Sequence, residues 1–160
     1  MAQWAIDDEI TADKLNKNRA FPSKVRVYLD SNQNLPTTTF TTIEFDKETY
    51  DISSEFSIVT HKFTALKAGY YSVQGSVEFY KVGVDVEDVE IWITGAGETS
   101  KAKNSIPGGN HYTTVVFADT FLLGIGDTIE IQAYTDGGGT VTLFGGSADT
   151  HLEIREVYES

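Results

Sequence analysis

The chain has 160 residues, no cysteine and a formal net charge of −12 at pH 7. Its length suits one domain with a hydrophobic core of its own, and the lack of cysteine excludes a disulfide framework and a thiolate metal site. The negative charge repels phosphate groups, so neither nucleic acid nor an anionic membrane is an expected partner.

Residues 1–19 differ in composition from the rest and are predicted to form a separate N-terminal arm. The stretch is polar, and its large aliphatic side chains are Ile6, Ile10 and Leu15. It has neither the basic start nor the apolar centre of a secretory signal. Because so short a polar segment buries little surface alone, it is either a flexible tail or an attachment arm. An attachment arm would become ordered on a partner, or on other copies of the chain, through these aliphatic residues.

Residues 20–160 are predicted to form one all-β domain. Alternating apolar and polar residues, rich in Val, Ile, Thr and aromatic side chains, indicate strands. Turn-forming stretches such as PGGN and DGGG separate these runs. About nine short strands without a convincing helix predict an antiparallel jelly-roll β-sandwich. The predicted strands are 24–30, 41–45, 56–63, 69–81, 88–94, 112–123, 127–135, 140–145 and 151–157.

The longest predicted strand, 69–81, contains a glycine where a large inward side chain is expected. Alternation along this strand places Tyr71, Val73, Gly75, Val77 and Phe79 on the inner face. A missing side chain at position 75 leaves a hole unless a large neighbour fills it. We therefore expect an aromatic side chain from the opposite sheet to pack over Gly75.

Several aromatic side chains fall on the outward positions of the predicted strands. Five such residues are too many for isolated exposed side chains, and they indicate that one side of the sandwich is covered. The cover is either a long loop or another copy of the chain, and the second alternative predicts an interface between copies of the chain. The residues are Tyr70, Tyr80, Trp92, Tyr134 and Phe144.

The acidic stretch DVEDVE, residues 85–90, is the one cluster with the composition of a metal site. Asp85, Glu87 and Asp88 offer carboxylate oxygens that suit calcium, although the spacing lacks the glycine and the length of a calcium-binding loop. A solvated acidic loop is the alternative reading, and no other cofactor is expected. No nucleophile with an adjacent base is apparent, so we expect no enzymatic activity. The histidines, His61, His111 and His151, have no second ligand at metal spacing.

Six residues resemble, in type and spacing, the signature of the C1q-like globular head family. They are Phe45, Asp51, Phe56, Phe63, Gly69 and Tyr71. The sequence departs from the family at positions 73 and 75, where Val73 and Gly75 replace aromatic residues. The resemblance covers roughly residues 20–158. It implies a jelly roll of about ten strands that assembles as a tight homotrimer.

The N-terminal stretch DEITADKLNKN resembles a repeat of phage fibre and tail proteins. Together with the C1q-like resemblance, it implies a trimeric virion protein of a bacteriophage. We expect a capsid decoration knob, of the cement or head-fibre type. Its arm would bind the major capsid protein or another virion protein, and its exposed loops could contact host-surface glycans. The alternatives are a tail-fibre or receptor-binding tip, and a secreted lectin-like binding module.

Overall fold

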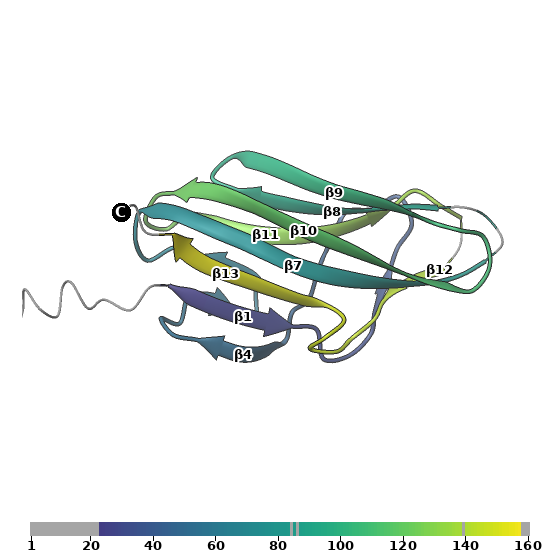
Figure 1. Cartoon of the computed structure of the whole chain (residues 1–160), viewed down its shortest axis with the longest axis horizontal. Coiled ribbons are helices and arrows are strands. Elements are labelled where there is room, and N and C mark those ends of the chain that lie inside the picture. Colours follow the sequence, from purple (N-terminus) through teal and green to yellow (C-terminus); the bar gives the residue numbers. More distant parts are fainter. Residues whose placement is uncertain (1–22, 84, 86, 139, 158–160) are drawn as a thin grey trace, which may run out of the picture.

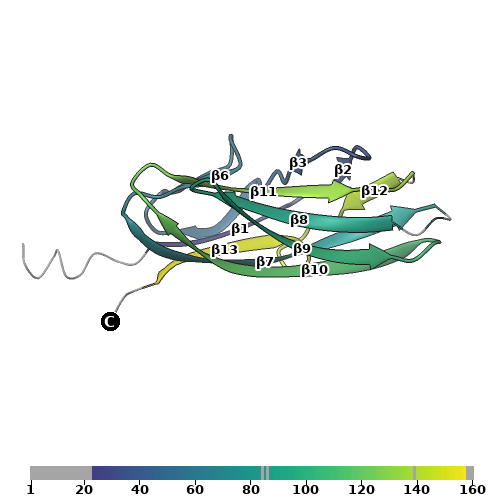
Figure 2. The ribbon, with the colours of Figure 1, turned by 90° about the horizontal axis from the view of Figure 1, so that it is seen from above.

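The computed structural model describes residues 23–83, 85, 87–138 and 140–157, which form an elongated sandwich of two antiparallel sheets (Figures 1 and 2). This confirms the predicted jelly-roll β-sandwich. No helix in the described part of the chain is long and apolar enough to cross a membrane. The strands are β1 (Lys24–Tyr28), β2 (Gln33–Leu35), β3 (Thr41–Thr42), β4 (Lys47–Asp51), β5 (Phe56–Ser57), β6 (Lys62–Thr64), β7 (Gly69–Val82), β8 (Glu87–Gly95), β9 (Glu98–Ile106), β10 (His111–Leu123), β11 (Thr128–Thr135), β12 (Thr140–Leu143) and β13 (His151–Val157).

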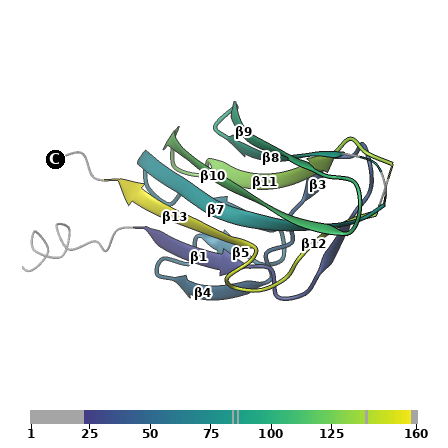
Figure 3. The same ribbon diagram turned by 45° about the vertical axis from the view of Figure 1, so that its right-hand side comes forward.

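The larger sheet has the order β2-β12-β7-β13-β1-β4, with β10 on the other edge of β7. Strand β7 organises this sheet, because β10 pairs along its whole length while β13 and β12 share its opposite edge. The smaller sheet has the order β5-β6-β11-β8-β9, and β3 also pairs with β11. Figure 3 shows β10, β7, β13 and β1 side by side, with β8, β9 and β11 in the second layer. Neighbouring strands are therefore mostly distant in sequence.

The core lies between the sheets and follows the predicted alternation. In β7 the residues Tyr71, Val73, Gly75, Val77 and Phe79 are all buried, as predicted. The same alternation holds in β8 and β11, where every second residue is buried. Apolar side chains of both sheets meet in this layer, and their removal from water is the main stabilising contribution to the fold.

The space beside Gly75 is filled by a side chain from a different sheet than predicted. The aromatic side chain over it is Phe117, which comes from β10 in the same sheet and not from the opposite sheet. Gly75 and Phe117 are direct partners in the β7–β10 register. A Cβ atom at position 75 would lie 2.6 Å from Cζ of Phe117 and closer still to the carbonyl oxygen of His151. The glycine therefore makes room for a neighbour in its own sheet.

Three further expectations about strands were wrong. The predicted strand 56–63 is divided into β5 and β6 by a tight turn, in which His61 has a φ of 57°. Strands β2 and β4 lie outside the predicted strands. Strand β9 was not predicted at all. Its sequence ETSKAKNSI is largely exposed, so it carries no alternating apolar signal.

Candidate interaction surfaces

The five outward aromatic residues lie on two different faces of the molecule. Tyr70 and Tyr80 belong to β7, and Phe144 follows β12, so these three belong to the larger sheet. Trp92 in β8 and Tyr134 in β11 belong to the smaller sheet. The expectation of one covered side is therefore wrong. Alternation correctly assigned the residues to outer faces, but it carries no information on which sheet each strand joins.

One aromatic cluster lies at one end of the larger sheet. The ring of Tyr80 lies 4.6 Å from the ring of Tyr112, its cross-strand partner in β10. Tyr112 also meets Phe144 edge to face, with ring centroids 5.5 Å apart. Tyr112 remains 55% exposed. These contacts orient the three rings within the protomer, while their outer surface stays open to solvent.

Apolar side chains continue along the outward positions of the larger sheet. Val116 in β10 is 72% exposed and Leu122 is 60% exposed. At the far end, Tyr70 pairs across strands with both Leu122 and Val157, so these three form a row over β10, β7 and β13. An exposed apolar surface of this kind commonly marks a protein interface. We call this surface, with the aromatic cluster, the outer face of the larger sheet.

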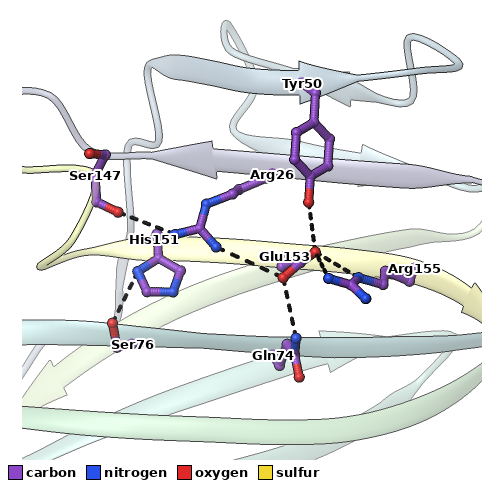
Figure 4. Close-up of polar contacts among 8 residues, drawn as sticks. All are labelled: Arg26, Tyr50, Gln74, Ser76, Ser147, His151, Glu153 and Arg155. Atoms are coloured by element: carbon purple, nitrogen blue, oxygen red, sulfur yellow. Dashed lines mark hydrogen bonds and ion pairs between the residues drawn. The ribbon is translucent and has the colours of Figure 1, made fainter.

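A polar cluster occupies the same face over β4, β1, β13 and β7 (Figure 4). At its centre is the buried carboxylate of Glu153, which accepts hydrogen bonds from the hydroxyl of Tyr50 at 2.6 Å and from Nε of Arg155 at 2.6 Å. Gln74 donates a third, at 3.3 Å. Burial by itself would raise the pKa of Glu153, but these donors outweigh it and lower the pKa below its ordinary value.

Beside this cluster lies a hollow of about 420 Å³ over the middle of the sheet. Its wall is polar on the β13 side, with His151 and Glu153, and apolar on the β10 side, with Val116 and Ala118. Burial lowers the pKa of His151, and the nearby charge of Arg26 lowers it further, against the opposing effect of Glu153. His151 is therefore neutral near pH 7.

The hydroxyl of Ser76 lies 3.1 Å from Nδ1 of His151 within the same hollow. It also lies 3.1 Å from the carbonyl oxygen of Asp149, to which it donates a hydrogen bond. Its proton is then directed at a backbone carbonyl and not at the imidazole. A serine nucleophile needs the opposite arrangement, in which a base accepts the hydroxyl proton. The Ser76–His151 pair is therefore a structural contact between β7 and β13.

The structure does not bring Asp85, Glu87 and Asp88 together around a common point. The side chain of Glu87 is fully buried and forms an ion pair of 3.3 Å with the equally buried Lys81. Asp88 instead accepts from Nζ of Lys103 at 2.6 Å, which lowers its pKa. Among the described residues, no three acidic or histidine side chains are grouped as metal ligands. The carboxylates of Glu87 and Asp88 are therefore held by two different lysines and do not converge on a calcium site.

The buried Lys81–Glu87 pair was missed at the sequence level. Lys81 continues the odd-numbered inner positions of β7, so strict alternation could have placed it inside. Thr135 also donates to the carboxylate of Glu87, at 3.3 Å. Any Cβ atom at Gly137 would overlap the side chain of Glu87, so the backbone of Gly137 closes over this site.

Most of the signature residues have structural roles. The four aromatic members are buried, and they form the edge-to-face pairs Phe45–Phe56 and Phe63–Tyr71. Asp51 accepts from the backbone N–H of Phe56 at 2.8 Å, which fixes the turn after β4. At Gly69, however, a Cβ atom would meet nothing nearer than 3.9 Å. A tight entry to β7 therefore does not require that glycine.

A second aromatic cluster lies on the outer face of the smaller sheet. Phe40, in the loop between β2 and β3, contacts Trp92 and Tyr134 with ring centroids 4.8 Å apart in both pairs. The indole N–H of Trp92 donates to Glu90 at 2.7 Å. For Trp92 and Tyr134 the cover is thus a loop of the same chain. Phe40 itself is 47% exposed.

The two-sheet topology and the aromatic core define the class of the fold: a jelly roll of the C1q and TNF type. Solved structures similar to this chain include the Eiger TNF of S. frugiperda, with a TM-score of 0.64 and 11% identity over 87% of this chain and 94% of that one. The globular domain of zebrafish complement 1qA gives 0.63 and 14%, over 86% and 99%. Murine APRIL at pH 5.0 gives 0.64 and 15%, over 85% and 99%. No protein-family model and no curated protein sequence matches the chain.

Proposed function

We propose that the chain is a non-enzymatic structural and binding protein that forms a homotrimer through the outer face of the larger sheet. The observation that carries this proposal is the apolar surface of that face, from Tyr112 through Val116 to Leu122. A solvent-exposed valine near the centre of β10 and an exposed leucine at its end give the lone protomer no stability. Buried against another copy, they would contribute roughly 25 cal/mol per Å² of apolar area removed from water.

Two features support self-association over an unrelated partner. The C1q-like signature implies a homotrimer, and the fold agrees with that resemblance. The polar cluster around Glu153 is already saturated with internal hydrogen bonds, so a second copy could cover it without leaving a buried charge unpartnered. In a closed assembly every copy presents the same face, so all three apolar surfaces are covered at once.

We further propose that the trimer is a bacteriophage virion protein that decorates the capsid. The support is the resemblance of the N-terminal stretch to phage fibre repeats. Residues 1–19 would act as the attachment arm, with Ile6, Ile10 and Leu15 packing against the major capsid protein or another virion protein. A tail-fibre or receptor-binding tip is the alternative placement. Electron microscopy of particles with the labelled protein tests this placement directly.

The second candidate is a secreted lectin-like binding module. It is favoured by the exposed aromatic cluster around Phe40, a kind of surface that a purely structural knob does not need. The two candidates share the trimer and differ in what the arm does. Capsid, portal or terminase genes beside the coding sequence would support the virion assignment, and a secretion operon would argue against it.

The trimer is tested by light scattering on the protein and on Val116→Glu. Because Val116 is 72% exposed in the protomer, the substitution should leave the protomer's fold intact. In the assembly it buries an unpartnered charge, so we expect the association constant to fall by roughly tenfold or more. The matched control is Val59→Glu. This valine is 84% exposed and lies in the β5–β6 turn, which belongs to the smaller sheet. A wild-type monomer at micromolar concentration would refute the proposed interface.

A further inference from the structure

We propose that the outer face of the smaller sheet carries a binding site for a neutral saccharide, formed by Phe40, Trp92 and Tyr134. This inference deepens the glycan-binding part of the proposed function and rests on it. The site lies within one protomer, on the sheet that the trimer interface does not use. Each copy of a trimer would therefore present one such site outward.

Phe40 makes the cluster a continuous aromatic surface. Its ring meets Tyr134 at an interplanar angle of 30° and Trp92 at 73°, each at 4.8 Å between centroids. With 47% of its surface exposed, Phe40 is the most open of the three rings and the one that an approaching ligand meets first. The N–H of Trp92 is held by Glu90, so the indole is fixed in orientation before any ligand arrives.

Polar side chains surround the rings at positions set by strand register. Lys101 in β9, Trp92 in β8 and Gln132 in β11 are direct cross-strand partners, so they form one line across the face. Tyr134 is likewise the partner of Glu90. The ammonium group of Lys101 lies 5.3 Å from the ring centroid of Trp92. The aromatic surface therefore has hydrogen-bond donors and acceptors along its edges.

The loop that carries Phe40 is held in a strained conformation. Thr38 has a φ of 55°, which is unfavourable for a β-branched residue. Its backbone N–H donates to the carbonyl oxygen of Thr135 at 2.8 Å, which ties the loop to the end of β11. Strained residues of this kind cluster at ligand clamps and persist only where the surroundings enforce them. The strain at Thr38 is thus a second, independent sign that the position of Phe40 matters.

The chemistry of this surface matches a pyranose ring. One face of a hexose presents C–H groups with partial positive charge, which stack on the negative face of an aromatic ring. The hydroxyl groups at the edge of the sugar both donate and accept, as do Glu90, Lys101 and Gln132 between them. The net charge of −12 disfavours sialylated or sulfated sugars, so the expected ligand is neutral.

A second copy of the chain is a poorer occupant for this face than for the larger sheet. Lys103 forms ion pairs with Asp88 and Glu90 beside the rings, at 2.6 and 3.6 Å. A dry protein interface would have to bury these half-exposed charges, which costs free energy. A sugar would cover the rings and hydrogen-bond at their edges, and it would leave the Lys103–Asp88 pair in water. Single-site affinity would then be weak, and three sites on one trimer would raise it through avidity.

The test uses the natural pair of tryptophans. The chain contains Trp4 and Trp92, so Trp4→Phe leaves Trp92 as the sole indole reporter. The full-length variant is screened on a panel of neutral oligosaccharides of glucose, mannose, galactose and N-acetylhexosamines, with sialylated and sulfated chains beside them. The best neutral binder is then titrated by tryptophan fluorescence. We expect saturable binding, and a loss of about tenfold in affinity for Phe40→Ala and for Tyr134→Ala.

The controls separate this inference from the proposed assembly. Val59→Ala, at an exposed valine in the β5–β6 turn, should leave the affinity unchanged, and thermal melting checks that each variant is folded. Val116→Glu should keep single-site affinity while it removes avidity. A trimer that binds no neutral saccharide on the panel, or binds only anionic ones, overturns the inference and leaves the trimer standing. Binding that persists at full strength in both Phe40→Ala and Tyr134→Ala also overturns it.

Discussion

At Gly75 the larger sheet has no room for a side chain. It is buried in the centre of β7, and the ring of Phe117 and the carbonyl of His151 occupy the space that a side chain would need. We therefore expect Gly75→Ala to destabilise the fold by roughly 1–3 kcal/mol through overpacking. The free energy of unfolding in urea, at one fixed protein concentration, measures this.

Gly69→Ala is the matched control for that prediction, because it makes the same change at the start of the same strand. A Cβ atom there has open space, and the loss of backbone freedom in the unfolded chain should make the variant neutral or more stable by about 0.4–1 kcal/mol. Equal destabilisation by the two substitutions would contradict the packing described around Gly75.

Single residues show how far the sequence could predict the interior. The inner residues of β7 were predicted because alternation and size identify core positions without knowledge of the fold. The signature aromatics were singled out by the family resemblance, and they are buried. Glu87 was not predicted to be buried, because its charge made it a candidate for the surface. Glu87 lies in the core because it forms an ion pair with Lys81, which is on the other side of the β7–β8 connection. The sequence alone does not reveal that a buried lysine neutralises the charge of a buried glutamate.

The cluster around Glu153 holds neighbouring strands of the larger sheet together. Tyr50 in β4 and Gln74 in β7 reach the same carboxylate from opposite sides of β13. Because the folded pKa of Glu153 is lowered, its contribution to stability is present above its unfolded pKa of about 4.5 and is lost as pH falls through the folded value. We expect Glu153→Gln to reduce the free energy of unfolding at pH 7, and to reduce it less as the solution is acidified below pH 4.5.

His151 on the same strand provides the comparison for this pH dependence. Its folded pKa is also lowered, so the stability it contributes as a neutral side chain is lost as pH falls from about 6.5 towards the folded value. In His151→Gln the difference from the wild type should therefore change mainly between pH 7 and pH 5, and in Glu153→Gln it should change mainly below pH 4.5. A change in the same pH window for both variants would contradict the assignment.

At the level of elements, β7, β8 and β11 were predictable and β9 was not. The first three carry one apolar face each, while β9 is a polar strand whose pairing is set by β8. The outer aromatics show the same limit. Alternation predicts that Trp92 and Tyr80 point outward, but only the sheet topology shows that they point to opposite sides. Long-range strand pairing decides where β9 forms and which sheet carries each outer aromatic residue, and a local sequence pattern does not encode that pairing.

The position of the chain ends bears on the proposed trimer and on its proposed attachment. Lys24 pairs with Arg155, so the described chain begins and ends at the same end of the sandwich. An arm that precedes residue 23 would start from that end, away from the aromatic cluster of Tyr80 and Tyr112. We therefore expect deletion of residues 1–19 to leave the trimer intact and to abolish binding to capsids, as measured by light scattering and by co-sedimentation with particles.

Substitution of Ile6, Ile10 and Leu15 by serine provides a finer form of the same experiment, because it keeps the length of the arm. It should weaken capsid binding as the deletion does, if the aliphatic side chains make the contacts. Truncated protein that still decorates particles would assign attachment to the sandwich itself.

The polar sequence of β9 has a consequence for crowding. This strand ends the order of the smaller sheet, and it displays Glu98, Lys101 and Lys103 along that border. Sheet borders rich in lysine resist the addition of a strand from another molecule. If the chain decorates a particle as proposed, neighbouring copies would stand side by side without pairing the borders of their sheets.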